Sequence, residues 1–483
     1  MIEVASVSSR ARRRPAPFAA CLKRAARGFV TITAAGAVLS GHVAYAQAPR
    51  ESGPKLNVIR DAETEELLRD YTRPILRAAK LGGQNIEVVL IGDRTFNAFV
   101  ADGRRIFVNI GALYDSETPN QIIGVLAHET GHIAGGHLAR MRDQIANAQT
   151  ASIVAMLLAL GGAAAGAATN SPGVGQALPG LIMGPQEMIR RSLLGYVRQQ
   201  EESADRAAVN FLNATGQSSK GMLETFERFA GQSMFISRSV DPYTLSHPMP
   251  RERIAALEHI ARGSPHFNKK DAPQLQQRHD MMRAKLSGFV DRPDAVLRRY
   301  PPSNNSLPAR YARAISSYRF GDVRASIANI DALIAEQPNN PYFHELKGQA
   351  LLESGQARAA VAPLRRAVAL SNGSALIRMM LGQALVQSGD ARLAGEAVAE
   401  LRRALAKEPN APLGYRQLAI ALGRSGDRAG ADLASAQASF NEGDFPTAKQ
   451  LAARAQRQFS KGSPGWLKAD DIVNYRPPKI GQN

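Results

Sequence analysis

Val125-Leu126-Ala127-His128-Glu129-Thr130-Gly131-His132 is the stretch of this chain that decides its fold. Seven residues upstream, Thr118 and Pro119 mark a helix start, with threonine at the N-cap and proline at the first helical position. The apolar residues between this start and the stretch recur with helical spacing and predict a buried face. A helix places His128 and His132 one turn apart on the same face, with Glu129 beside them.

This spacing of two imidazoles and a carboxylate is typical of zinc peptidases. His128 and His132 can occupy two corners of a tetrahedral zinc site. Glu129 projects about 100° further round the helix, which is too far to bind the metal. It can still take a proton from a water held on zinc while that water attacks a peptide carbonyl. We therefore expect one Zn²⁺ per chain, with Glu129 as the catalytic base.

A catalytic zinc needs a third protein ligand. A histidine six residues after His132 is excluded because position 138 is Leu138, and His137 comes one residue too early on a continuous helix to face the metal. We interpret His137 as structural or as support for a ligand. Further along the chain, Glu201 and Asp205 lie four apart in a helical run, so one could bind zinc while the other orients a ligand imidazole. The residues alone do not choose between Glu201 and Glu202.

Four segments, taken in order, resemble the landmarks of the M48 metallopeptidases, a family of gluzincins. They are 97–99 after a strand-like 86–91, the stretch 125–132, the acidic run 201–205, and 246–254. The resemblance covers roughly residues 55 to 260. It implies an α+β metallopeptidase domain with a small sheet, the activity of a zinc metalloendopeptidase (EC 3.4.24 class), and Glu201 as the third zinc ligand.

The resemblance also implies roles for the last of these segments. His247 is expected to lie over the metal, where it either acts in catalysis by stabilising the oxyanion or occupies the open position as a removable, gating fourth ligand. Asp205 and Arg253 are expected to support the ligands from a second layer of contacts. A His247 held on zinc would silence the enzyme until it was displaced.

The N-terminal 46 residues have the pattern of a cleavable signal peptide. A basic stretch precedes an apolar stretch at 28–41, and Ala44-Tyr45-Ala46 offers a cleavage site. A permanent anchor is the alternative, but the apolar stretch is short for a membrane span. Without this segment the net charge falls from +18 to about +12, and the single cysteine, Cys21, is removed. We expect a periplasmic protein that lacks disulfides and thiolate catalysis.

Residues 144–186 carry no charged side chain. Glycines and prolines interrupt this segment, so it does not read as a membrane-spanning helix, and residues 170–179 look like a loop. We expect either a mobile apolar flap or a buried helical hairpin. A flap would cover the cleft, make peripheral contact with a membrane, or receive hydrophobic substrate.

The C-terminal third repeats with a period of 34 residues, which is the tetratricopeptide period. The sequence Gly-Gln-Ala-Leu occurs at 348–351 and again at 382–385. Turn glycines and small residues on both helices of each unit follow the same register. The turns are expected at Gly321, Gly355, Gly389 and Gly426, and the small positions at Ala314, Gly348, Gly382 and Ala419 on the first helices and at Ser326, Ala360, Ala394 and Ala431 on the second. A further helix pair is expected to end near Phe459.

The chain is therefore expected to be mostly α-helical and to consist of five parts. These are a signal peptide (1–46), a zinc metallopeptidase domain (47–265), a connector with a helix around 275–286 (266–305), an α-solenoid of tetratricopeptide repeats (306–460), and a C-terminal tail (461–483). Repeats of this kind present a groove for a peptide or a partner protein.

This organisation resembles the periplasmic subgroup of the M48 family. The subgroup implies degradation of misfolded or stalled outer-membrane proteins, assistance in their assembly, and contact with the outer-membrane assembly machinery through the repeat groove. Two alternatives remain: a non-proteolytic chaperone or scaffold built on the repeats, and an integral-membrane peptidase. Nucleic acid is not an expected partner, because the basic residues form no recognition motif.

Overall fold

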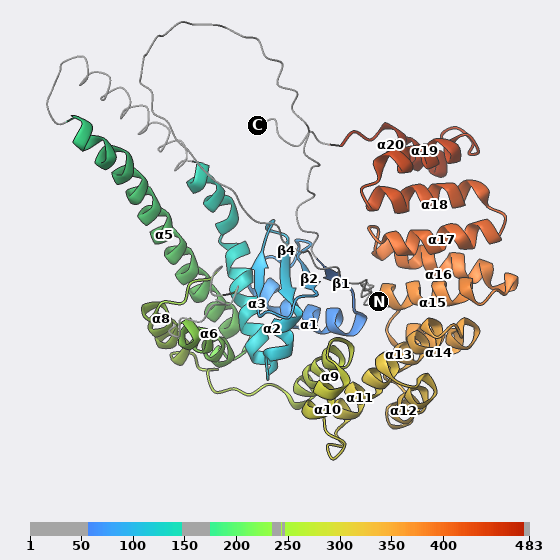
Figure 1. Cartoon of the computed structure of the whole chain (residues 1–483), viewed down its shortest axis with the longest axis horizontal. Coiled ribbons are helices and arrows are strands. Elements are labelled where there is room, and N and C mark those ends of the chain that lie inside the picture. The colour runs from blue at the N-terminus through green and yellow to red at the C-terminus, as the bar shows by residue number, and fades with distance from the viewer. Residues whose placement is uncertain (1–56, 147–173, 234–242, 244–246, 478–483) are drawn as a thin grey trace, which may run out of the picture. The chain divides into compact units, whose positions relative to one another are not determined.

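The structure is a computed structural model, and it describes residues 57–146, 174–233, 243 and 247–477 (Figure 1). The predicted signal peptide, 1–46, lies outside the described residues, as do residues 147–173 of the uncharged apolar segment.

Four short strands form a single sheet in the order β1-β2-β4-β3. Strands β2 and β4 run parallel, whereas the two outer pairs are antiparallel. Strand β2 confirms the strand predicted at 86–91, and β3 leaves one edge of the sheet without a partner strand among the described residues. The strands are β1 (Val58–Ile59), β2 (Glu87–Ile91), β3 (Ala98–Val100) and β4 (Arg105–Asn109).

Helices surround this sheet in the N-terminal half of the chain (Figure 1). Helix α3 begins at Pro119, as predicted, with Thr118 in extended conformation at the N-cap. Its apolar residues Ile122, Val125 and Leu126 have no exposed surface, so the predicted apolar face is buried. The helices are α1 (Ala62–Ala78), α2 (Ile110–Asp115), α3 (Pro119–Ala134), α5 (Val174–Ala214), α6 (Lys220–Ser233) and α8 (Arg251–Arg262).

Helix α5 corrects one expectation. The loop predicted at 170–179 is wrong from Val174 onward, because the backbone is helical from that residue to Ala214. Glycine and proline are only weak guides to helix ends. Once a helix has formed, extending it is easier than starting it, because each added residue brings one more hydrogen bond. The acidic run 201–205 therefore lies on a helix of 41 residues.

Helices α3 and α5 approach each other closely at Gly131. A Cβ at this position would lie 2.8 Å from the backbone oxygen of Ala204. Only glycine fits such a contact without moving a helix backbone. This close approach brings the acidic run of α5 next to the two histidines of α3.

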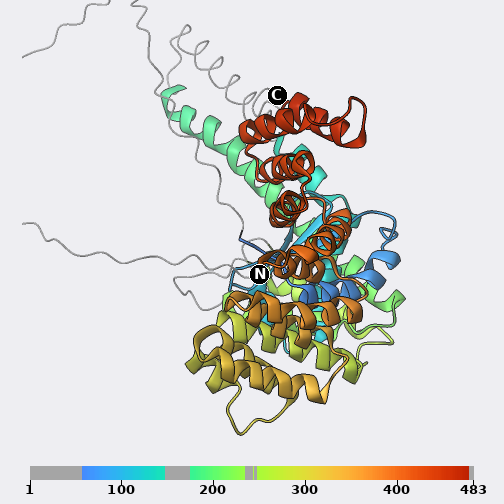
Figure 2. The same ribbon diagram turned by 90° about the vertical axis from the view of Figure 1, so that its right-hand side faces the viewer.

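The C-terminal half is a stack of paired helices, as the 34-residue period predicts (Figures 1 and 2). A Cβ on Gly348 or Gly382 would lie 2.4 Å from the leucine of the paired helix, Leu364 or Leu401, so the predicted small positions permit close packing. The predicted fold class is confirmed. The pairs are α11 (Leu307–Phe320) with α12 (Val323–Glu336), α13 (Pro341–Glu353) with α14 (Ala357–Leu370), α15 (Ala375–Gln387) with α16 (Ala394–Lys407), and α17 (Pro412–Arg424) with α18 (Arg428–Asn441); a single 3-10 turn, η1 (Ala391–Leu393), precedes α16.

The end of the repeat stack differs from the prediction. Only one helix, α19 (Phe445–Gln456), ends near Phe459, and its partner α20 (Pro464–Asn474) lies in the part expected to be a tail. Ala469 and Ile472 of α20 are buried against α18 and α19. The missed signal is Ser463-Pro464, since the Ser463 side chain accepts a hydrogen bond from the backbone of Trp466 and caps this helix.

The expected connector contains two helices, α9 (Pro273–Val290) and α10 (Pro293–Arg299), each with proline in its first turn. The predicted helix at 275–286 is confirmed as part of α9. Lys285 of α9 is buried and forms ion pairs with Asp61 (2.6 Å), Glu63 (3.3 Å) and Glu345 (3.7 Å). We call these four residues the junction cluster, because they tie α9 to the start of α1 and to α13.

Among the described residues, no helix has both the length and the apolar character that a membrane span requires.

Candidate metal centre

Helix α3 delivers the two predicted histidines and Glu129 into the interior of the protein. His128 and Glu129 have no exposed surface, and 14% of the His132 side chain is exposed. The imidazole Nε2 atoms of His128 and His132 lie 3.0 Å apart. The helical spacing of the motif thus places the two imidazoles side by side on one face of α3.

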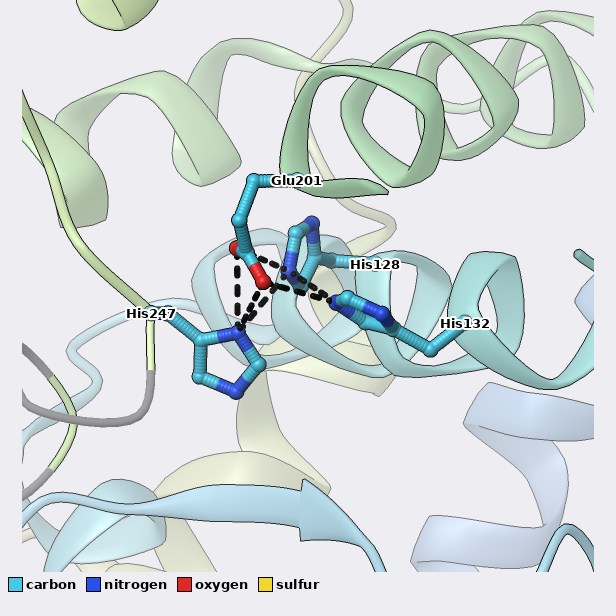
Figure 3. Close-up of side chains that lie close together, drawn as sticks. All are labelled: His128, His132, Glu201 and His247. Carbon is cyan, nitrogen blue, oxygen red and sulfur yellow. Dashed lines mark hydrogen bonds and ion pairs between the residues drawn. The ribbon is translucent and has the colours of Figure 1, made fainter. Parts of the chain in front are cut away.

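Glu201 from α5 and His247, just before α8, complete a group of four (Figure 3). The carboxylate of Glu201 lies 3.3 Å from His128 Nε2 and 3.4 Å from His132 Nε2. His247 Nδ1 lies 3.1 Å from Glu201 and 3.3 Å from His128 Nε2. We call His128, His132, Glu201 and His247 the metal cluster. Glu202, the alternative to Glu201, is exposed.

The metal cluster has the dimensions of a tetrahedral zinc site. With zinc bonds of about 2.0–2.1 Å, the ligand atoms at the corners of a tetrahedron are about 3.3–3.4 Å apart. Five of the six residue pairs in the cluster have atoms 3.0 to 3.4 Å apart, and all four ligand atoms lie within 4.8 Å of one another. Imidazole nitrogens and carboxylate oxygens, which these three histidines and one glutamate supply, are also ligand atoms that zinc commonly binds. The residues present therefore fit a zinc ion.

The outward-facing nitrogens of the two histidines strengthen this conclusion. His128 Nδ1 lies 2.9 Å from Asp205, and His132 Nδ1 lies 3.0 Å from His137 Nδ1. If these contacts use the Nδ1 hydrogens, the Nε2 lone pairs of the two histidines face each other. Such lone pairs repel unless a cation lies between them. The pattern of contacts therefore favours a cation in the metal cluster.

Arg253 holds the acidic residues from the outer side. Its guanidinium donates to both carboxylate oxygens of Asp205, at 2.7 and 2.9 Å, and lies 2.8 Å from Glu201. It also donates to the backbone oxygen of Pro248, next to His247. The structure thus places Asp205 against a histidine and Arg253 against both acids, where supporting residues would be expected.

The pKa values of Glu129 and Glu201 are shifted in opposite directions. Burial raises the pKa of Glu129 above its ordinary value. Burial acts on Glu201 in the same direction, but His247 and His128 outweigh it and lower the pKa of that carboxyl far below its usual range. Glu201 is therefore ionised, as a metal ligand must be, whereas Glu129 is the better proton acceptor near neutral pH.

The histidines also differ. Burial on its own lowers the pKa of His128, yet Asp205 and Glu201 outweigh burial and raise the pKa to about 9. Burial and the nearby His128 lower the pKa of His132 well below its ordinary value. The acidic neighbours thus favour a positive charge on His128, whereas burial favours the neutral form of His132.

A cavity of about 340 Å³ opens beside the metal cluster. Glu129 and His247 line this cavity, together with Phe99 and Val100 of the edge strand β3. Its walls are mainly apolar and include Phe99, Val100, Ile133, Leu138 and Val197. The cavity thus gives a molecule with apolar groups access to the metal cluster.

Three residues near the centre carry no motif that predicts their position. The ring of Tyr243 packs 4.8 Å from that of His247, and Phe226 places its edge against His128 at 5.4 Å between ring centres. His137 was expected to be structural or supporting, but its contact with His132 was not predicted.

The expected flap at 144–186 lies outside the described residues over 147–173, and its remainder from 174 is helix α5.

The comparisons with known proteins agree with the site. A model described as peptidase family M48 matches residues 61–261, a range that includes every residue discussed above. The chain is 26% identical over 270 residues to the beta-barrel assembly-enhancing protease of Escherichia coli (strain K12), covering 53% of this chain and 52% of that protein. It is 30% identical over 200 residues to metalloprotease YcaL of the same strain, covering 38% of this chain and 71% of YcaL.

The chain therefore spans about half the length of the assembly-enhancing protease that it matches. Among solved structures, MamA matches with a TM-score of 0.27 and 21% identity, covering 33% of this chain and 90% of that chain.

Proposed function

Because the chain belongs to peptidase family M48, we propose that it is a zinc-dependent endopeptidase whose metal is held by His128, His132 and Glu201, with Glu129 as the base. The observation that carries this proposal is the metal cluster itself: donor atoms from three separate parts of the chain at distances of 3.0 to 3.4 Å. A zinc ion bound there would polarise the carbonyl of the cleaved peptide bond and activate a water molecule.

The residues of the chain divide the remaining work. Glu129 lies in the wall of the cavity, and among the described residues neither of its carboxylate oxygens accepts a hydrogen bond, although His247 Nε2 lies 3.4 Å from Oε1. A buried carboxylate without a donor is poised to accept a proton and to pass it to the nitrogen of the leaving peptide. Asp205 and Arg253 keep His128 and Glu201 in place while this proton moves.

His247 has two candidate roles, and the distances favour one of them for the resting protein. Its Nδ1 atom belongs to the metal cluster, and its Nε2 atom lies 3.4 Å from Glu129 Oε1. We propose that His247 is a removable fourth ligand, and that a substrate displaces it. After displacement, the imidazole could stabilise the negative charge that develops on the substrate carbonyl oxygen.

We further propose that the substrates are misfolded or stalled outer-membrane proteins in the periplasm. The similarity to the beta-barrel assembly-enhancing protease of Escherichia coli supports this choice. Unfolded chains of this kind are extended and rich in alternating apolar residues, which suits the apolar cavity. The repeat groove would bind the outer-membrane assembly machinery or the client itself, and binding there raises the local concentration of client near the metal. Peripheral membrane contact through 144–186 stays a prediction.

The proposal is tested with Glu129→Gln. The purified chain, loaded with zinc, should cleave an unfolded outer-membrane protein at least about 100-fold faster than this variant, because the general base is lost. Zinc content, measured by mass spectrometry, should be unchanged. Glu252→Gln, at an exposed position of α8, is the matched control and should cleave normally.

Equal cleavage by the wild-type chain and Glu129→Gln would sink the peptidase proposal. If, in addition, both prevent the client from aggregating, a chaperone or scaffold built on the repeats would become the better description. If the chain is extracted only with detergent, the integral-membrane alternative gains instead.

A further inference from the structure

The turn that ends helix α3 brings His137 back toward the metal cluster. The helix stops at Ala134, and Gly136 has a positive φ of 61°. Residues 137–146 are helical again, so His137 is the first residue of a new helix. The break changes the register that a continuous helix would give, and it lets the His137 ring fold over His132.

Gly135 provides the space for this fold. A Cβ on Gly135 would lie 2.3 Å from Nε2 of His137 and 2.6 Å from its Cδ2. No real side chain sits that close to another ring, so any other residue at 135 would push the His137 ring away. The pair of glycines therefore does more than end the helix: it admits an imidazole beside a candidate metal ligand.

His137 contacts His132 through defined atoms. The two Nδ1 atoms are 3.0 Å apart and the rings are nearly perpendicular, at 82°. Nε2 of His132 faces His128 and Glu201 at 3.0 and 3.4 Å. For that Nε2 to offer a lone pair, the ring hydrogen must be on Nδ1, where His137 Nδ1 is the available acceptor.

The backbone of His137 is fixed as well. Gln200 donates from Nε2 to the His137 carbonyl oxygen at 3.2 Å, and both residues are more than 90% buried. Gln200 directly precedes Glu201 on α5. The position of His137 is thus tied to the helix that supplies the acidic member of the metal cluster.

On these contacts we propose that His137 is a positioning residue for His132: it accepts the Nδ1 hydrogen of His132 and thereby fixes the tautomer and ring angle that aim Nε2 at the metal. This inference rests on the proposed zinc site. The two histidines of the motif then have different supports. His128 contacts the carboxylate of Asp205 at 2.9 Å, whereas His132 contacts the imidazole of His137 at 3.0 Å.

The test measures zinc affinity rather than activity. The purified chain is titrated with Zn²⁺ against a chromophoric chelator. His137→Phe keeps an aromatic ring but removes the acceptor, and should weaken zinc binding about 10- to 100-fold. His137→Asn places Oδ1 near the former Nδ1 and should recover most of the affinity. Gly135→Ala should weaken binding by displacing the ring. His259→Phe, at an exposed histidine of α8, should bind as wild type does.

Spectra of the Co²⁺-loaded chain add a second readout, since the visible bands should change with His137→Phe and return toward wild type with His137→Asn. Wild-type affinity in His137→Phe would overturn the inference and leave the zinc site standing. Equal losses in the phenylalanine and asparagine variants would also overturn it, because ring packing alone would then explain the effect. A wild-type chain that binds no zinc would instead overturn the proposed function, and this inference with it.

Discussion

The metal cluster and the junction cluster are both buried groups of charged side chains, but they are balanced in opposite ways. In the junction cluster the chain supplies its own cation, since Lys285 Nζ lies 2.6 to 3.7 Å from three carboxylates. In the metal cluster, four donor atoms face one another, and among the described residues the nearest fixed cation, Arg253, contacts Glu201 and Asp205 from outside.

This difference separates a structural role from a binding role. Burying a charge without a partner is costly, so each cluster needs a positive charge at its centre. Where the sequence provides that charge, the cluster holds helices together. Where the sequence brings only donor atoms together, the cluster is able to hold a metal ion. Burial and perturbed pKa values occur in both and do not distinguish them.

The largest expected effect comes from removing the internal cation. Lys285→Met leaves the acidic side chains of Asp61, Glu63 and Glu345 without their cation, and should lower the free energy of unfolding by about 3–5 kcal/mol, measured by urea denaturation. Zinc content should not change if the two clusters are independent. The matched control is Lys347→Met, which removes a more exposed lysine paired with Asp331 and should cost less than about 1 kcal/mol. Loss of zinc from Lys285→Met would break the comparison.

The next effect concerns the ion itself. Glu201→Gln removes the ionised member of the metal cluster and should weaken zinc binding at least about 100-fold, which corresponds to about 2.7 kcal/mol. The measurement is competition with a chelator, together with the rise in melting temperature on adding zinc, which should shrink. Glu202→Gln, one residue along the same helix but exposed, should bind zinc normally. If Glu202→Gln lost zinc binding and Glu201→Gln kept it, Glu202 and not Glu201 would be the third ligand.

A smaller effect should appear in the pH dependence of stability. Burial raises the pKa of Glu345 from 4.5 to about 7. The folded chain therefore keeps a proton that the unfolded chain releases, so this group stabilises fully below about pH 4.5 and its contribution is lost as the pH rises to about 7. Glu345→Gln stays neutral and should be about 1–3 kcal/mol more stable than wild type at pH 7.5. The two unfolding curves should converge at pH 4.5.

A constant difference between Glu345→Gln and wild type across this pH range would mean that Glu345 is ionised throughout, and that Lys285 balances all three acids. Charge pairing with Lys285 would then be enough to explain the stability of the whole junction cluster. Measuring both proteins in the same buffers removes the contribution of the histidines, which titrate in the same range.

Local patterns in the sequence predicted most of the fold. The helix at 119–134, the strand at 87–91 and the 34-residue repeat all follow from periodicity and from start signals that lie within a few residues of each other. Glu201 was reached from the spacing of a motif on a helix together with a family resemblance. These features depend on neighbours in the chain, which a sequence displays directly.

Features that depend on distant contacts were missed. Lys285 meets partners more than 200 residues earlier in the chain, and no period or motif marks such a pairing. The contact between His137 and His132 depends on a helix break at two glycines, and a continuous helix had been assumed. Tyr243 and His247 are only four residues apart, and the backbone N–H of His247 donates to the backbone oxygen of Tyr243 at 2.7 Å, but no motif marks this local contact. Helix α20 is a different case, because its start signal, Ser463-Pro464, is local.

Helix α5 makes the geometry of the metal cluster sensitive to events far from it. Glu201 lies 27 residues after the start of this helix at Val174, which is about 40 Å along its axis. A rod of that length, held near one end by the Gly131 contact, works as a lever. A shift of a few ångströms at the start of α5 would tilt the helix by a few degrees and move the Glu201 carboxylate relative to the other donor atoms of the metal cluster.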